Sequence, residues 1–297
     1  MNSTRATIST DEILAGAATA SGLELAGAEL IRDGSHAIYR LAGGIVARIG
    51  APSSLEAAIR EVRIAQWLND SGIPAVEPMA FLPQTVVVHD RPVTWWHRIP
   101  DHRPATPEEL GSMLRNLHAL SPPPELELPT YDPFTGLCNR LALSSTLDED
   151  DREWLLHHHN ELRTRYDTLP KPDPLTVIHG DAWQGNLVVP SSGVPRVLDL
   201  DKVSLGLREW DLIQLAVDYT DFNRIFEDDY RSFVSAYGGY DVTSWPHFRL
   251  LADIQELRWL GFAVARAEDS RAAAQHAKHR IECLRGQVPR PWTWTAL

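Results

Sequence analysis

Polar side chains that could do chemistry gather in one part of the chain, between residues 175 and 202. His179, Asp181, Asn186, Asp199 and Asp201 follow one another there at short intervals. Apolar runs flank them, and such runs are typical of buried strands. An unpaired carboxylate is costly to bury. A bound cation and a proton to be abstracted would give so many carboxylates a function, so we interpret this stretch as the candidate reaction centre.

The apolar runs predict three short strands that hold these polar side chains. The first ends at Ile178, the second spans residues 187–189, and the third begins at Val197. Residues 190–195 combine proline, serine and glycine, which indicates a turn between the last two strands. We therefore expect the polar side chains to lie in the loops at the strand ends.

A small α+β region is expected to precede this centre. Strand-like runs at residues 28–31, 37–41 and 45–49, separated by turns that contain glycine, predict an antiparallel meander. A helix over residues 9–22 is expected before the meander, and a hairpin over residues 85–96 after it.

Residues 54–69 have the pattern of an amphipathic helix, with Ser54 at its N-cap. Glu61 on this helix has only apolar neighbours at helical spacing, so its side chain should face inward. A carboxylate in that position needs a cationic partner. Arg48, on the preceding strand, is the candidate.

From residue 107 onward the sequence is mostly helical in pattern. The expected helices cover residues 107–120, 148–168, 209–221, 225–237 and a long segment at 246–285. The layout thus predicts an α+β protein. Its small antiparallel-sheet lobe would comprise residues 1–99, and its larger, mostly helical lobe residues 100–297.

The bulk composition excludes some classes of function. The chain has 297 residues and a net charge of −12, which argues against binding to nucleic acid or to an anionic membrane surface. Two cysteines suggest a reducing compartment. No apolar run approaches the ~20 residues of a membrane span, and we find no signal peptide. We therefore expect a cytoplasmic protein, and its oligomeric state stays open.

The spacing of the polar residues resembles that of a known group. His179-Gly-Asp181, followed by Asn186 and then by an apolar-Asp-x-Asp pattern at 198–201, is similar to the aminoglycoside phosphotransferase and choline kinase group of the protein-kinase-like superfamily. The similarity extends over nearly the whole chain. It implies a bilobal protein-kinase-like fold, with a nucleotide-binding N-terminal lobe and a helical C-terminal lobe that carries the catalytic loop and the acceptor site.

The resemblance also implies roles for individual residues. Asp181 would take the proton of the acceptor hydroxyl, and Asn186 and Asp199 would hold Mg²⁺, a cation that prefers oxygen ligands. Arg48, fixed by Glu61, would bind the phosphates of ATP or GTP.

Further roles concern the nucleotide and the catalytic loop. Ser35 and the amides of its turn would cover the phosphates. The carbonyl of His97 and the amide of Ile99 would contact the adenine edge. His179 would orient the catalytic loop through hydrogen bonds, and Asp211 would cap backbone amides of the same loop.

Some positions depart from the family pattern or have an ordinary structural explanation. Arg48 stands where the superfamily has lysine, and the sequence lacks a full G-x-G-x-x-G loop. Ser35 is explained equally well as a turn residue, and the Arg48–Glu61 pair also fits a structural ion pair. Asp201 fits a second metal contact, a substrate contact or a supporting role.

These features predict a Mg²⁺-dependent small-molecule O-phosphotransferase. It would move the γ-phosphate of ATP or GTP to a hydroxyl of an antibiotic, such as an aminoglycoside, or of a small metabolite, and it could serve antibiotic resistance. One alternative is a non-catalytic nucleotide-binding pseudokinase, although Asp181, Asn186 and Asp199 are all present. Another is a metal-dependent phosphoesterase, although the sequence has no Gly-Asn-His element.

The acidic residues are unevenly distributed. Residues 101–170 contain 13 Asp and Glu against six Arg and no Lys. A solvated surface explains this segment. The more specific hypothesis is an acceptor site for a cationic substrate, such as an aminoglycoside or a basic peptide antibiotic, to which Glu256 or Asp253 contributes.

Overall fold

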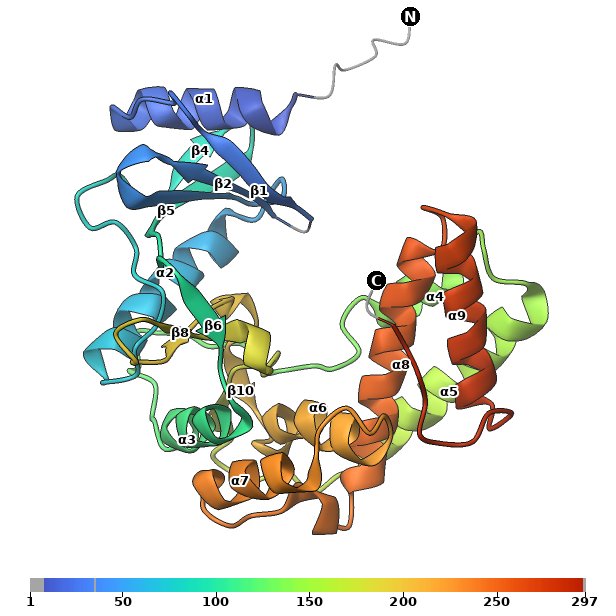
Figure 1. Cartoon of the computed structure of the whole chain (residues 1–297). Helices are drawn as coiled ribbons and strands as arrows, with labels where there is room; N and C mark the ends of the chain where they lie inside the picture. Colours follow the sequence, from blue (N-terminus) through green and yellow to red (C-terminus); the bar gives the residue numbers. More distant parts are fainter. Residues whose placement is uncertain (1–7, 35, 296–297) are drawn as a thin grey trace, which may run out of the picture. The chain divides into compact units, whose positions relative to one another are not determined.

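The computed structural model describes residues 8–34 and 36–295 (Figure 1). It consists of two compact units. Unit 1 comprises Met1–Ala105, Pro122–Glu127 and Gly185–Val203, and unit 2 comprises Thr106–Ser121, Leu128–Gln184 and Ser204–Leu297. The functional division into residues 1–99 and 100–297 stays a prediction.

Unit 1 is built on a five-stranded antiparallel sheet with the strand order β1-β2-β3-β5-β4. The predicted meander and the predicted hairpin are both confirmed. The strands are β1 (Glu29–Asp33), β2 (Ala37–Leu41), β3 (Ile45–Ile49), β4 (Val86–Val88) and β5 (Arg91–His97).

The two faces of this sheet differ in polarity, because successive side chains of a strand point to opposite sides. One face packs against helix α1 (Thr10–Ser21) in a cluster that includes Tyr39 and Trp95 (Figure 1). The alternate positions of β3 and β5 place Arg48 beside Thr94 on the other face. The sheet therefore separates an apolar core from the charged side chain that the sequence analysis singled out.

Helix α2 (Leu55–Asp70) confirms the predicted amphipathic helix, but its N-terminus corrects one detail. Ser54 occupies the N-cap position without capping the helix. Its backbone has φ −98° and ψ 21° instead of the extended conformation that directs a capping oxygen at the first turn. The Ser54 hydroxyl donates to the Ala51 carbonyl instead, at 2.7 Å.

A three-stranded sheet in unit 1 contains the hairpin formed by the predicted strands at residues 187–189 and 197. Its strands are β6 (His102–Pro104), β8 (Leu187–Pro190) and β9 (Arg196–Val197), and the sequence analysis had not identified the first of them. The Val76 and Val197 amides donate to the carbonyls of Val197 and Pro74, both at 2.9 Å. These bonds tie the hairpin to the segment that follows α2.

Unit 2 consists mainly of helices, and none of those described is long and apolar enough to cross a membrane. The predicted segment 246–285 is two helices, because Ser270 starts a new one by accepting the Ala273 amide at 3.2 Å. The strand pair β7–β10 and helix α4 complete the unit, and neither β10 nor α4 was expected. The elements are α3 (Pro107–His118), α4 (Leu137–Ala142), α5 (Glu149–Asp167), β7 (Thr176–Ile178), β10 (Ser204–Gly206), α6 (Glu209–Thr220), α7 (Glu227–Tyr237), α8 (Phe248–Arg266) and α9 (Arg271–Leu284).

Helix α3 packs closely on α7. Gly111 makes this approach possible, since a Cβ atom at that position would lie 2.5 Å from the Phe233 carbonyl oxygen. The packing matters for the candidate site because α3 ends at His118, whose Nε2 atom lies 3.0 Å from the Asp211 carboxylate on α6.

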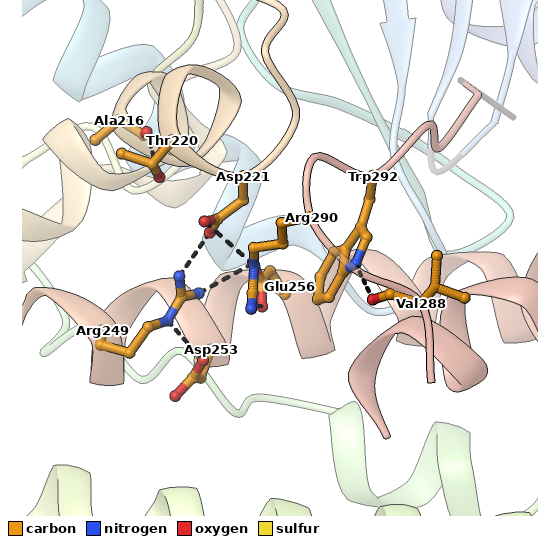
Figure 2. Close-up of polar contacts among 9 residues, drawn as sticks. All are labelled: Ala216, Thr220, Asp221, Arg249, Asp253, Glu256, Val288, Arg290 and Trp292. Carbon is orange, nitrogen blue, oxygen red and sulfur yellow. Dashed lines mark hydrogen bonds and ion pairs between the residues drawn. The ribbon is translucent and has the colours of Figure 1, made fainter. Parts of the chain in front are cut away.

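A buried charge cluster anchors the C-terminal segment of unit 2 (Figure 2). Arg290 binds the carboxylates of Asp221 (3.2 Å) and Glu256 (3.0 Å). Arg249 binds the same two groups, at 2.7 and 3.0 Å. The Trp292 amide donates to the Asp221 carbonyl at 2.8 Å. The segment after α9 is therefore held to the C-terminal end of α6 and to the middle of α8 by charge as well as by packing.

We expect this cluster to make the stability of the protein depend on pH. Burial, and then the hydrogen bond to Asp221, raise the pKa of Glu256 to about 8. Between the ordinary pKa of 4.5 and about 8 the folded state thus holds a proton that the unfolded state has lost, so stability falls as pH rises through this range. The slope is roughly 1 kcal/mol per pH unit.

The Glu256→Gln variant, which cannot titrate, should flatten this slope. Urea unfolding between pH 5 and 8 would measure it. Asp253→Asn is the matched control, since Asp253 also binds Arg249 but is partly exposed. Parallel curves for the wild type and Glu256→Gln would contradict the prediction.

Candidate functional site

The first part of the site is centred on Arg48 in unit 1. The Arg48 guanidinium forms an ion pair with Glu61 on α2, whose residue surface is only 6% exposed. This confirms the predicted pair. The Arg48 Nη2 atom also lies 3.2 Å from Asp199 Oδ1 and 3.2 Å from His36 Nδ1. A guanidinium can make these contacts together because its donors form a planar fork, which the single ammonium of lysine lacks.

Burial has the largest effect on the pKa values of the two titratable groups beside Arg48, Glu61 and His36. Burial raises the pKa of Glu61 to about 7, against the opposing effect of Arg48. Burial, and then Arg48, lower the pKa of His36 to about 4. His36 is therefore neutral near pH 7 and adds no positive charge beside Arg48.

The β8–β9 hairpin brings the two predicted metal ligands together. Leu187 pairs with Val197, and the Leu198 amide donates to the Asn186 carbonyl at 2.8 Å. Asn186 and Asp199 thus lie at the same end of the hairpin. Asp199 has φ 54° and ψ 61°, a left-handed conformation that few residues other than glycine adopt. Such strained residues occur preferentially at functional sites.

Asp201 lies in the short helical turn Leu200–Lys202 that follows Asp199. Its carboxylate is 3.0 Å from the Lys202 ammonium. The charge of Asp201 adds to the rise in the pKa of Glu61, which burial dominates. At His36 the same charge opposes the lowering of the pKa by burial and Arg48. These contacts place Asp201 in the same electrostatic neighbourhood and leave its three possible roles open.

The remaining predicted nucleotide contacts lie in unit 1 as well. Ser35 falls outside the described residues. The His97 amide donates to the Glu77 carbonyl at 2.8 Å, and the Arg98 amide to the Gly44 carbonyl at 2.8 Å. The expected adenine contacts use other groups, the His97 carbonyl and the Ile99 amide, and they stay predictions.

The second part of the candidate site is the loop that carries Asp181, in unit 2. Asp211, in the first turn of α6, accepts the His179 amide at 2.6 Å and the Gly180 amide at 2.8 Å. Its carboxylate is fully buried and also lies 3.0 Å from His118 Nε2. The prediction that Asp211 caps the amides of this loop is confirmed.

Further hydrogen bonds fix the backbone on either side of Asp181. The Gly180 carbonyl accepts the Tyr131 hydroxyl at 3.1 Å and the Trp210 indole N–H at 3.2 Å. The Asp181 amide donates to His179 Nδ1 at 3.3 Å, which confirms that His179 orients the loop. Gly180 has φ 81°, a conformation that glycine adopts readily. The loop that carries Asp181 is therefore rigidly supported within unit 2.

Sequence reasoning missed three residues of these networks. Tyr131 and His36 had been given no role, and Tyr237, whose hydroxyl lies 2.8 Å from His118 Nδ1, had not been singled out. The local sequence around these three residues gives no sign of their contacts, because each side chain binds a partner that is distant in the sequence. Their positions could be found only from the fold.

The donor set fits a hard divalent cation. Asn186 and Asp199 offer amide and carboxylate oxygens, and the Asp199 side chain is partly exposed. Within residues 8–34 and 36–295, no group of three or more His, Cys, Asp and Glu could hold a metal ion. Two protein ligands suit Mg²⁺ that is bound together with nucleotide phosphates and water.

The model of the phosphotransferase enzyme family matches residues 28–251, which include the Arg48 cluster, the catalytic loop and the hairpin. The chain belongs to this family. Among curated proteins, none matches the sequence.

Solved structures of other phosphotransferases share the fold, which is the bilobal protein-kinase-like fold expected above. An amicoumacin kinase bound to AMP-PNP, Ca²⁺ and its ligand has a TM-score of 0.73 at 14% identity, covering 97% of this chain and 96% of its own. A spectinomycin phosphotransferase bound to ADP and spectinomycin has a TM-score of 0.63 at 14% identity, with the same coverage. A choline/ethanolamine kinase family protein from Mesorhizobium loti has a TM-score of 0.59 at 18% identity, covering 86% and 87%.

Proposed function

We propose that this member of the phosphotransferase enzyme family is a Mg²⁺-dependent kinase that transfers the γ-phosphate of ATP or GTP to a hydroxyl group of a small molecule. The observation that carries the proposal is the position of Arg48 between Glu61 and Asp199. This arrangement orients a cation for phosphate oxygens beside a carboxylate suited to a metal ion.

Each residue of the site has a role in this proposal. Asp181 accepts the proton of the attacking hydroxyl, while the Asp211 contacts hold its loop in place. Arg48, fixed by Glu61, binds the nucleotide phosphates. Asn186 and Asp199 would hold Mg²⁺, which, when bound, neutralises charge on the phosphoryl group.

Other proposed contacts concern the nucleotide. The His97 carbonyl and the Ile99 amide bind the base edge, and Ser35 covers the phosphates. The AMP-PNP and ADP in the complexes of the amicoumacin kinase and the spectinomycin phosphotransferase support a nucleotide of this type.

A cationic acceptor, such as an aminoglycoside, receives no support from the two carboxylates named for it. Glu256 is only 1% exposed and binds Arg249 and Arg290. Asp253 binds Arg249 at 2.8 Å. Both acidic side chains are thus already bound by arginines of the same chain. A function in antibiotic resistance stays a prediction.

The test is a phosphate-transfer assay with ATP and with GTP over a panel of hydroxyl-bearing antibiotics and metabolites. Transfer to at least one acceptor is expected with Mg²⁺, and none with EDTA. A pseudokinase would instead bind the nucleotide without any transfer.

Asp199→Ala separates the proposed metal contribution from nucleotide binding. In the wild type, Mg²⁺ should increase the thermal shift given by ATP, and in Asp199→Ala this increase should disappear. Asp70→Ala, at an exposed position on α2, is the control. A variant that keeps the full Mg²⁺ effect would contradict the assignment of Asp199 as a ligand.

A further inference from the structure

Arg258, on helix α8, reaches toward the support of the catalytic loop. Its Nη1 atom donates to the Pro133 carbonyl at 2.6 Å, two residues after Tyr131. Its guanidinium lies 5.5 Å from the ring centroid of Trp210. Tyr131 and Trp210 are the two side chains that bind the Gly180 carbonyl. Arg258 therefore lies one layer behind the residue that precedes Asp181.

A second arginine, Arg140, approaches from α4. Helices α4 and α8 are in contact, and their approach is close at Gly261. A Cβ atom at Gly261 would lie 2.4 Å from Leu137 Cδ1, and 3.8 Å from both Cδ and Nη1 of Arg140. Gly261 is three residues after Arg258 on the same helix, so the two guanidinium groups are neighbours. Partial burial, and then Arg258, lower the pKa of Arg140, as expected for adjacent cations.

Among the described residues, neither of the two positive charges has an acidic ion-pair partner. Within the described ranges, no carboxylate oxygen lies within 4.0 Å of either guanidinium. Asp132 is close enough for Arg258 to help lower its pKa, but its carboxylate binds Arg163 at 2.8 Å and the Phe134 amide at 3.0 Å. Arg140 is exposed and Arg258 is partly exposed.

This pair of arginines is unusual in a chain with a net charge of −12. By contrast, Arg249, Arg285 and Arg290 each bind a carboxylate. Neighbouring like charges repel, and a bound anion would remove this repulsion while accepting hydrogen bonds from both guanidinium groups.

We propose that Arg140 and Arg258 form a binding site for an anionic group, a carboxylate or a phosphate, on the acceptor of the phosphoryl group. The proposal rests on the proposed kinase function, because it names the class of molecule that is phosphorylated. The electrostatic neighbourhood of Tyr131 includes both Arg258 and Asp181. An acceptor whose anionic group binds the arginines could thus present a hydroxyl to the proposed base. Arg258 lies outside the part of the chain that the family model matches, residues 28–251.

The test uses four sugars that share one ring and differ in charge: glucose, glucosamine, glucuronate and glucose 6-phosphate. Their affinities for the full chain are measured by calorimetry with ADP and Mg²⁺ present, so that the nucleotide site is occupied. The variants are Arg258→Met and Arg140→Met, which keep an apolar stem and remove the charge. Arg271→Met removes an exposed arginine of α9 and is the matched control. Arg258→Lys serves as a second variant if Arg258→Met does not fold.

An anionic sugar should bind at least about tenfold more tightly than glucose or glucosamine, as expected for a charge-assisted contact. Tighter binding of glucuronate would show that the arginines prefer a carboxylate, and tighter binding of glucose 6-phosphate that they prefer a phosphate. Arg258→Met and Arg140→Met should each weaken that binding about ten- to a hundredfold, and Arg271→Met should leave it unchanged. Equal affinity for glucose and both anionic sugars, or unchanged binding by Arg258→Met, would overturn the proposal.

Phosphate transfer to the same sugars separates this proposal from the one on which it rests. If binding depends on Arg258 but no acceptor is phosphorylated, the proposed kinase function is wrong and the anion site is supported. If neutral or cationic acceptors are phosphorylated and Arg258→Met does not change this transfer, the kinase function is supported and the anion site is wrong.

Discussion

Replacing Asp181 by Asn is expected to lower kcat by about 10²- to 10⁴-fold, the usual contribution of a general base. Asn has nearly the size of Asp but cannot take the proton of the attacking hydroxyl. The loop should keep its conformation, because its bonds to Asp211, Tyr131 and Trp210 involve the backbone of the two preceding residues. Affinity for the nucleotide should change little, since Arg48 binds the phosphates in the proposed mechanism.

Steady-state transfer rates and nucleotide titrations on the same preparation would measure both quantities. Asp70→Asn makes the same chemical change at an exposed position, and it should behave as the wild type. Turnover by Asp181→Asn within a few fold of the wild type would remove Asp181 as the base. A parallel loss of nucleotide affinity would point to a change in the fold instead.

Replacing Asp211 by Asn is expected to destabilise the protein by about 3–5 kcal/mol, the range seen when one partner of a buried charged network is removed. Both Asp211 oxygens accept backbone amides, and one also lies beside His118. Asn keeps one acceptor oxygen and replaces the other with an NH₂ donor. This NH₂ group would face the N–H of His179 or Gly180 in a buried contact. The bonded amide would then lose its partner, and the catalytic loop would lose one of its two anchors.

Urea unfolding measures the global effect, and hydrogen exchange at the His179 and Gly180 amides measures the local one. Asp181→Asn is the matched control, because it changes a partly exposed carboxylate in the same loop. An unchanged unfolding midpoint together with unchanged protection of both amides would show that Asp211 is not a structural anchor.

Local signals were sufficient to predict the Arg48–Glu61 pair and the proximity of Asn186 to Asp199. Asp181, Asn186 and Asp199 lie within one short stretch of the sequence, and the apolar runs beside them mark the strands that they follow or precede. The inward position of Glu61 followed from its neighbours on an amphipathic helix, and its need for a cation indicated Arg48.

Contacts between segments that are distant in the sequence could not be predicted from local patterns. Arg48 and Asp199 are 151 residues apart, and no periodicity links them. The pairing of β7 with β10 and the bond from Tyr131 to Gly180 also depend on how helices pack. Ser54 failed as a cap although its residue type was suitable, because the backbone dihedrals decide where a hydroxyl points. The break at Ser270 was hidden because helical patterns continue on both sides of it.

The anchored C-terminal segment sets a lower limit to how far the chain can be shortened. Trp292 and Trp294 pack against Phe222, and Arg280 donates to the Thr295 carbonyl at 2.7 Å. Ending the chain after α9 would uncover this aromatic surface and leave the carboxyl groups of Asp221 and Glu256 to Arg249 alone. The family match ends at residue 251, so a minimal domain cut at that boundary would lose part of its own core.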